Sequence, residues 1–289
     1  MKFSAVLSAL GLAASAAAAS LQQVTNFGSN PSNVKMFIYV PDKVAANPAI
    51  VVAIHYCTGT AKAYFNGSPY KTLADQKGFI VIYPESPYSG TCWDVSSKAT
   101  LTHNGGGNSN SIANMVTYAL DKYKGNKSKV FVTGSSSGAM MTNVMAATYP
   151  ELFAAGIVYN GVPAGCFYTG SVNGWNSTCA HGNVKQTASQ WAQQVFNADP
   201  GYKGSRPRMQ IYHGSVDATL YPANYQETIK QWSGVFGYNP DKPTSSKQNT
   251  PQTNYRTDVF GDHLTGVWAV GVGHTVPIRG ADDMKFFGL

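Results

Sequence analysis

Short apolar runs alternate with longer segments of helical periodicity along most of this chain. Residues 49–56 are apolar nearly throughout, as are 209–213, which is typical of strands buried on both faces. Residues 34–40 alternate apolar and polar positions, and 109–123 repeat apolar side chains at helical spacing. We expect strands at 34–40, 49–56, 78–83, 153–160 and 209–213, and helices at 68–77, 109–123, 188–196 and 225–236.

This order of elements predicts an α/β fold with a mostly parallel central sheet and helices on both faces. A last hairpin is expected from 255–260 and 266–270, followed by a short helix. The polar segment 239–254 has no apolar periodicity and is expected to be an exposed excursion, and 161–183 a loop. With 43% hydrophobic and 12% charged residues, and no internal repeat, the chain is expected to form a single domain.

The first residues carry the pattern of a secretory signal peptide. Lys2 precedes an apolar run, and small residues ending in Ala19 follow it. The run is short and alanine-rich, and no basic segment follows, which argues against a membrane anchor. We expect residues 1–19 to be the signal peptide of a secreted, extracellular protein and residues 20–289 to be its domain.

The net charge is basic but not concentrated. There are 21 Lys and Arg residues against 14 Asp and Glu, a formal charge of +7, and the lysines are scattered. The densest basic patch, Arg206–Arg208, precedes an apolar strand and is better explained as a solvated strand start. We therefore expect no nucleic-acid partner and no membrane partner.

Four cysteines in a secreted chain allow two disulfides and three connectivities. We favour Cys57 with Cys92, which would join two loops at strand ends, and Cys166 with Cys179, which would close a loop rich in Gly and Asn. Their spacing does not resemble a zinc site, so we expect no metal and no cofactor. Glycosylation sequons at surface loops are expected at Asn126, Asn176 and, more weakly because a proline follows it, Asn66.

Residues 134–138 read Gly-Ser-Ser-Ser-Gly, between an apolar β-branched run and a helical pattern. In a strand–turn–helix of this kind the central serine is held on a strained backbone with its hydroxyl clear of the sheet. Gly134 and Gly138 would remove side chains that collide with the neighbouring strand and helix. Ser136 is therefore the candidate nucleophile.

An α/β-hydrolase places its catalytic groups at the carboxyl ends of strands in the chain order Ser, acid, His. Asp217 follows the strand 209–213 and His274 follows the strand 266–270, which completes that order. Asp258 and Asp262 are rival acids, but both fall within or at the tip of the hairpin. His55 and His213 are expected to organise loops by hydrogen bonding, and His103, His181 and His263 to lie at the surface.

A tetrahedral intermediate needs two backbone donors for its oxyanion. One follows the nucleophile, at Ser137, and the other is expected after the strand 49–56, at or next to Cys57. Three aromatic side chains are candidates for lining the cleft and contacting substrate, because they lie on the predicted loops around it: Tyr56, Trp93 and Trp175.

Several motifs together resemble the secreted fungal acetylxylan esterases of carbohydrate esterase family 1, over essentially the whole mature chain. They are HYCTGTA (55–61), TCWDV (91–95), HNGGG (103–107), GSSSGAMMTNVMAATYPELFAAG (134–156), GVPAGCF (161–167) and GVGH (271–274). The resemblance implies Ser136, Asp217 and His274 as a triad, Cys57 and Ser137 as oxyanion donors, and release of acetate from acetylated xylan. Some relatives carry a carbohydrate-binding module after a Ser/Thr-rich linker, and we expect none here.

Other functions are weighed against this one. Feruloyl esterases and polyhydroxybutyrate depolymerases resemble the chain more distantly. Feruloyl esterase activity on arabinoxylan is the alternative function, because the size of the acyl pocket cannot be read from the sequence. A carbohydrate-binding protein on an inactive hydrolase scaffold would need a broken triad, and a structural cell-wall protein would need repeats. The sequence therefore favours a monomeric, glycosylated esterase of xylan degradation.

Overall fold

The computed structural model describes residues 19–289, and residues 1–18 of the predicted signal peptide lie outside them. The strands are β1 (Gln22–Val24), β2 (Lys35–Tyr39), β3 (Ile50–Ile54), β4 (Ile80–Glu85), β5 (Val130–Ser135), β6 (Ala155–Tyr159), β7 (Arg208–Gly214), β8 (Ser245–Gln248), β9 (Tyr255–Gly261) and β10 (Leu264–Ala269). The helices are α1 (Ala61–Gly67), α2 (Tyr70–Lys77), α3 (Asn108–Tyr123), α4 (Ser137–Thr148), α5 (Ser177–Ala180), α6 (Ala188–Ala198), α7 (Ala223–Phe236) and α8 (Gly280–Phe287), with a short 3-10 turn at Ser89–Thr91. In this part of the chain no helix is long and apolar enough to cross a bilayer.

The strands form one sheet in the order β1-β2-β4-β3-β5-β6-β7-β10-β9-β8. The six strands from β4 to β10 in that order run parallel, and antiparallel pairs complete both edges. The mostly parallel sheet is therefore as predicted. Because parallel strands end at the same edge of a sheet, the loops after β3, β5, β6, β7 and β10 meet there.

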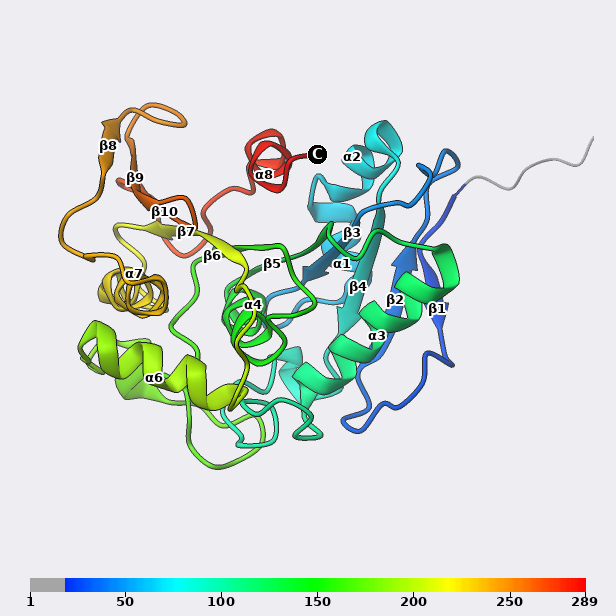
Figure 1. The fold of residues 1–289 in the computed structure, drawn as a ribbon, viewed down its shortest axis with the longest axis horizontal. Helices are drawn as coiled ribbons and strands as arrows, with labels where there is room; N and C mark the ends of the chain where they lie inside the picture. The colour runs from blue at the N-terminus through cyan, green and yellow to red at the C-terminus, as the bar shows by residue number, and fades with distance from the viewer. Residues whose placement is uncertain (1–18) are drawn as a thin grey trace, which may run out of the picture.

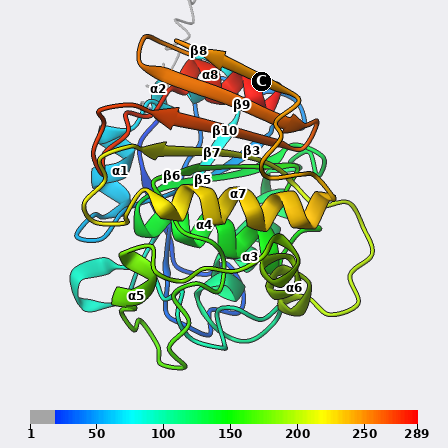
Figure 2. The ribbon, with the colours of Figure 1, turned by 90° about the vertical axis from the view of Figure 1, so that its left-hand side faces the viewer.

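Helices cover both faces of this sheet, as predicted (Figures 1 and 2). Helices α3, α4, α6 and α7 lie on one face and α1, α2 and α8 on the other. Alternate side chains of strand β3 pack on opposite faces of the sheet. Ile50, Val52 and Ile54 pack in the first core, and Val51 and Ala53 pack in the second. Both sides are apolar because both are buried.

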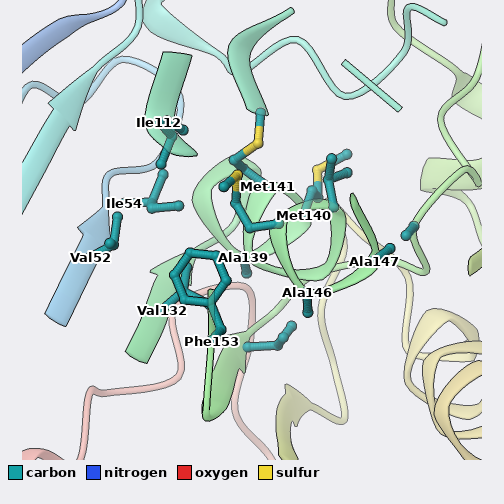
Figure 3. Close-up of a cluster of buried hydrophobic side chains, with 14 of the residues drawn as sticks. Val52, Ile54, Ile112, Val132, Ala139, Met140, Met141, Ala146, Ala147 and Phe153 are labelled. Atoms are coloured by element: carbon teal, nitrogen blue, oxygen red, sulfur yellow. The ribbon is translucent and has the colours of Figure 1, made fainter. Parts of the chain in front are cut away.

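Helix α4 lies in the middle of the larger core, and all its residues are buried. Figure 3 shows its Ala139, Met140 and Met141 close to Val132 of β5 and Ile112 of α3. A helix without a polar face is stable only when other elements surround it. This packing fixes the start of α4, which directly follows the candidate nucleophile.

Helix α8 is fastened to the other face by a buried carboxylate. Asp283 is fully buried and accepts hydrogen bonds from the hydroxyls of Tyr70 at 2.7 Å and Tyr159 at 2.5 Å. Burial raises the pKa of Asp283 to about 7, against the lowering effect of these two hydrogen bonds.

Some local expectations were wrong. Segment 239–254 is exposed but contains β8, which pairs antiparallel with β9. An edge strand of this kind needs only backbone hydrogen bonds, so Ser245–Gln248 has no apolar pattern to reveal it. The loop 161–183 contains the short helix α5, and β1 and α1 were not predicted. In α2 the buried residues are Tyr70 and Ala74, and the half-buried Leu73 packs against the same core.

Candidate active site

The nucleophile turn has the strained geometry that its motif predicts. Between β5 and α4, Ser136 has φ 55° and ψ −119°, a combination that non-glycine residues rarely adopt. A Cβ on Gly138 would lie 2.1 Å from the carbonyl oxygen of Ile54, and one on Gly134 would lie 2.4 Å from that of Gly138. The two glycines therefore let β3, β5 and α4 approach closely enough to force this turn.

Three segments far apart in the sequence bring their polar side chains together at this turn. The Nε2 atom of His274 accepts a hydrogen bond from Ser136 Oγ at 2.7 Å. Its Nδ1 atom donates to Asp217, at 2.8 Å from Oδ2 and 3.0 Å from Oδ1. These residues follow β5, β7 and β10, as expected from the chain order. The arrangement can transfer a proton from the serine hydroxyl to the imidazole.

The environment keeps Asp217 ionised. Burial alone would raise the pKa of this carboxyl, but hydrogen bonds from His274, Asn160 and the backbone of Thr219 outweigh it and hold the pKa below its ordinary value. The N–H groups of Thr219 and Leu220 lie 2.9 Å and 3.0 Å from Oδ1. A fixed negative charge here favours the imidazolium that forms when His274 takes a proton.

Sequence reasoning missed Asn160, which joins the acid to the histidine loop. Its Nδ2 atom donates to Asp217 Oδ2 at 2.8 Å, and its Oδ1 atom accepts from the backbone N–H of Val276 at 3.3 Å. Asn160 is buried and has φ 55°, in the left-handed region that asparagine tolerates. The available signal was a polar residue at the carboxyl end of a buried parallel strand.

His55 and His213 organise loops, as expected. His213 donates to the carbonyl of Leu220 at 2.8 Å, and burial lowers its pKa, so it is neutral beside Asp217. His55 donates from Nδ1 to the carbonyl of Tyr56 at 2.7 Å and accepts from the backbone of Ser86 at 3.2 Å. The rival acids lie elsewhere: Asp258 pairs with Arg256 on the hairpin, and Asp262 is exposed at its tip.

The backbone N–H groups of Ser137 and Cys57 are the candidate oxyanion donors. Ser137 is the first residue of α4, where N–H groups have no partner within the helix. Within residues 19–289, neither this group nor the N–H of Cys57 donates to a protein acceptor, and both residues line the cleft. The disulfide Cys57–Cys92 links the loop that carries Cys57 to the segment that carries Trp93. The backbone N–H of Trp93 donates to Ser137 Oγ at 2.8 Å.

The serine and histidine open into a cavity of about 690 Å³, which all three candidate aromatic side chains line. Trp93 is 2% exposed, and its indole N–H donates to the carbonyl of His55 at 2.8 Å. Tyr56 and Trp175 are 41% and 56% exposed at the rim. The second disulfide, Cys166–Cys179, closes the loop that carries Trp175. Both bridges follow the pairing that the sequence favoured.

One side-chain group outside the cleft has metal-ligand chemistry. In the described part of the chain, ligand atoms of His103, Glu151 and Asp199 lie within 4.8 Å of one another. The Nδ1 atom of His103 already donates to the carbonyl of Thr148 at 2.7 Å. None of the three residues lines the cleft, so this group takes no part in the arrangement around Ser136.

The sequons differ in their surroundings. Asn66 is exposed but lies in the last turn of α1, so the expectation of a loop was wrong there. Asn126 lies in the loop before β5 and is half-buried. Asn176 caps α5, because its Oδ1 atom accepts from the backbone of Cys179 at 3.0 Å.

Comparisons with known proteins identify a family of esterases. The family model of the esterase PHB depolymerases matches residues 34–241. Acetylxylan esterase A of Aspergillus ficuum is 68% identical over 272 residues, which cover 93% of this chain and 90% of that protein. Probable acetylxylan esterase A of Aspergillus fumigatus is 69% identical over 272 residues, covering 93% of this chain and 73% of that protein.

Two solved structures of esterases also resemble this chain. Acetyl xylan esterase from Aspergillus awamori superimposes with a TM-score of 0.92 at 69% identity, over 93% of this chain and 99% of that chain. The feruloyl esterase module from Clostridium thermocellum superimposes with a TM-score of 0.55 at 13% identity, over 89% of this chain and 82% of that chain. The second likeness is evidence for the fold alone, which is that of the α/β-hydrolase esterases.

Proposed function

We propose that this chain, which belongs to the esterase PHB depolymerase family and to its acetylxylan esterases, is a secreted serine esterase that deacetylates acetylated xylan. The observation that carries the proposal is the hydrogen-bonded series Asp217–His274–Ser136, of which Ser136 and His274 line the cleft. The close relationship supports the substrate class, and the geometry supports the mechanism.

In the first half of the reaction, Ser136 Oγ attacks the carbonyl carbon of the acetyl ester while its proton passes to His274 Nε2. The carbonyl oxygen becomes an oxyanion that the N–H groups of Ser137 and Cys57 stabilise. The bond between the carbonyl carbon and the xylose oxygen then breaks, and His274 returns the proton to that oxygen. The sugar hydroxyl leaves, and the acetyl group remains on Ser136.

In the second half, water takes the place of the sugar. His274 removes a proton from the water as its oxygen attacks the acetyl carbon, and the second tetrahedral intermediate uses the same donors. Its collapse returns the proton to Ser136 Oγ and releases acetate. Asp217 stays ionised throughout and holds the imidazole with Nε2 toward the serine. Each oxyanion donor lowers the barrier by about 3 kcal/mol.

We assign substrate contacts to the aromatic side chains of the cleft. The exposed Trp175 offers a flat surface on which a xylose ring can stack, and Tyr56 lies on the rim beside Cys57. The buried Trp93 forms part of the wall next to the nucleophile. The sugar chain then lies across the rim while its acetyl group reaches Ser136.

The disulfides and the sequons are consistent with a secreted protein. Two disulfides fit an oxidising extracellular environment. We propose that residues 1–19 are removed on secretion and that residues 20–289 act as a monomeric catalytic domain. Asn126, Asn176 and Asn66 are the sites at which glycan is expected.

Acetate and ferulate release from matched polysaccharides test this function. Native protein and Ser136→Ala are assayed with acetylated xylan and with feruloylated arabinoxylan. We expect fast release of acetate that the variant loses. Dominant release of ferulate would retain the mechanism and overturn the substrate, and clearing of a polyhydroxybutyrate suspension would point to the third activity.

A further inference from the structure

Asp94 is a buried carboxylate that the reaction above does not use. It directly follows Trp93 and is 1% exposed. It accepts hydrogen bonds from neutral donors: the backbone N–H groups of Ser97 and Asn173 at 3.0 Å each, and the hydroxyls of Ser97 at 2.5 Å and Thr100 at 2.8 Å. Burial would raise the pKa of Asp94, but these hydrogen bonds outweigh it and lower the pKa below its ordinary value. The carboxylate is therefore charged and serves as an anchor for backbone groups.

One of those backbone groups belongs to a segment 79 residues away in the sequence. Asn173 lies in the loop 161–183, two residues before Trp175. Ser96 adds further bonds to the same loop: its Oγ accepts from the N–H of Gly174 at 2.7 Å, and its carbonyl accepts from the N–H of Thr169 at 3.0 Å. Residues 160–176 contain no helix or strand that would hold them in place. The disulfide Cys166–Cys179 closes this loop, and the hydrogen bonds that hold residues 169–174 to the rest of the protein go to the segment that carries Asp94.

The anchored residues form the rim of the cleft. Asn173, Gly174 and Trp175 line the same cavity as Ser136. Trp93, the residue before Asp94, donates a hydrogen bond from its backbone N–H to Ser137, the residue after the nucleophile. Asp94 thus connects the wall beside the reacting serine to the rim that carries the exposed indole.

We propose that Asp94 is a positioning residue that holds the loop 169–175 in place and so sets how the enzyme binds the polysaccharide chain around the acetyl group. This inference rests on the proposed function. Asp94 touches neither the ester nor the triad, so its effect should depend on substrate size. A small ester needs only the triad and oxyanion donors, whereas xylan also needs the rim.

The test compares native protein with Asp94→Asn on two substrates. The amide oxygen can keep the Oδ1 position, where it still accepts from the N–H groups of Ser97 and Asn173, but these hydrogen bonds lose the charge of the carboxylate and weaken. The hydroxyls of Ser97 and Thr100 can rotate to accept from the NH₂ group, so the variant should fold. We expect kcat and KM for p-nitrophenyl acetate to stay within twofold of native values. The KM for acetylated xylan should rise about tenfold, the loss of one well-placed aromatic contact. Glu227→Gln is the matched control, because Glu227 is equally buried and accepts from the backbone of Gln186 away from the cleft.

A double variant tests whether Asp94 acts through Trp175. If it does, Asp94→Asn should add little to the KM change that Trp175→Ala causes on xylan. Fully additive effects would overturn the proposal, as would unchanged KM for xylan in the single variant. An equal fall of kcat on both substrates would show a merely structural role and would also overturn it.

Hydrogen exchange separates this inference from the proposed function. In Asp94→Asn the backbone amides of Asn173 and Gly174 should exchange faster, while those of β5 and α4 stay protected. Unchanged exchange at these two amides would contradict the anchor whatever the substrate is. Faster exchange in a protein whose native form releases no acetate from xylan would retain the anchor and refute the function.

Discussion

Replacing Asp217 with asparagine should lower kcat about 10⁴-fold while the protein remains folded. In the native protein the carboxylate has two differently used oxygens. Oδ1 accepts from the N–H groups of Thr219 and Leu220, and Oδ2 accepts from Asn160 and His274. An asparagine would place its oxygen toward the two backbone donors, because turning it round would leave both of them facing an NH₂ group.

The asparagine would also change the tautomer of His274. The new NH₂ group would occupy the Oδ2 position and face His274 Nδ1 and Asn160 Nδ2, both of which are donors in the native site. His274 can relieve its part of this conflict by moving its proton to Nε2. In that tautomer Nε2 cannot accept the proton of Ser136. The loss of about 10⁴ corresponds to about 5 kcal/mol in the barrier.

The assay is steady-state hydrolysis of p-nitrophenyl acetate at pH 7, with thermal unfolding as the check on folding. Asp262→Asn is the matched control, because Asp262 is exposed at the tip of the hairpin between β9 and β10. This control should retain full activity. A loss below tenfold in Asp217→Asn, with an unchanged melting temperature, would refute the tautomer argument.

Three further changes test the packing around the site. Gly138→Ala would place a Cβ 2.1 Å from a backbone carbonyl oxygen of β3, and the variant should lose about 2 kcal/mol of stability and at least tenfold in kcat. Gly67→Ala, whose new Cβ would have nothing within 4 Å, should lose neither, because alanine favours helix α1. Asp283 binds its proton more tightly when folded, since burial raises its pKa to about 7; its contribution to stability is full below about pH 4 and is lost as the pH rises through 7. Between pH 4 and pH 8 the unfolding free energy in urea should therefore change by about 4 kcal/mol less favourably in the native protein than in Asp283→Asn, because all other groups titrate alike in both; an equal change in the two proteins would contradict this. Replacing Cys166 and Cys179 together with alanine opens a loop with a sequence separation of 13 and should cost about 3 kcal/mol of unfolding free energy, measured by denaturant titration; an unchanged midpoint would refute it.

The sequence predicts the central sheet well because its strands are buried on both faces. The apolar run of β3 and the strand–turn–helix motif around Ser136 carry strong local signals. Asp217 and His274 could be predicted because each follows a strand in the order that the turn requires. In these cases a local pattern and the global topology agree.

Other features depend on contacts that no local pattern records. Strand β8 is held mainly by backbone pairing with β9, so its side chains remain polar and mostly exposed. Asn160 acts through Asp217 and Val276, 57 and 116 residues away. Asp94 holds the loop with Trp175 across 79 residues. A buried polar residue reveals such a role only when its partners are placed by the fold.

Labelling by a serine-directed phosphonate, mapped by peptide mass spectrometry, tests most directly whether Ser136 is the nucleophile. We expect one equivalent of phosphonate to abolish acetate release from acetylated xylan and to be found on Ser136. The variant His274→Ala should react far more slowly, because it lacks the base that removes the serine proton. An adduct on Ser135 or Ser137, or full activity in protein labelled at Ser136, would contradict the proposed mechanism.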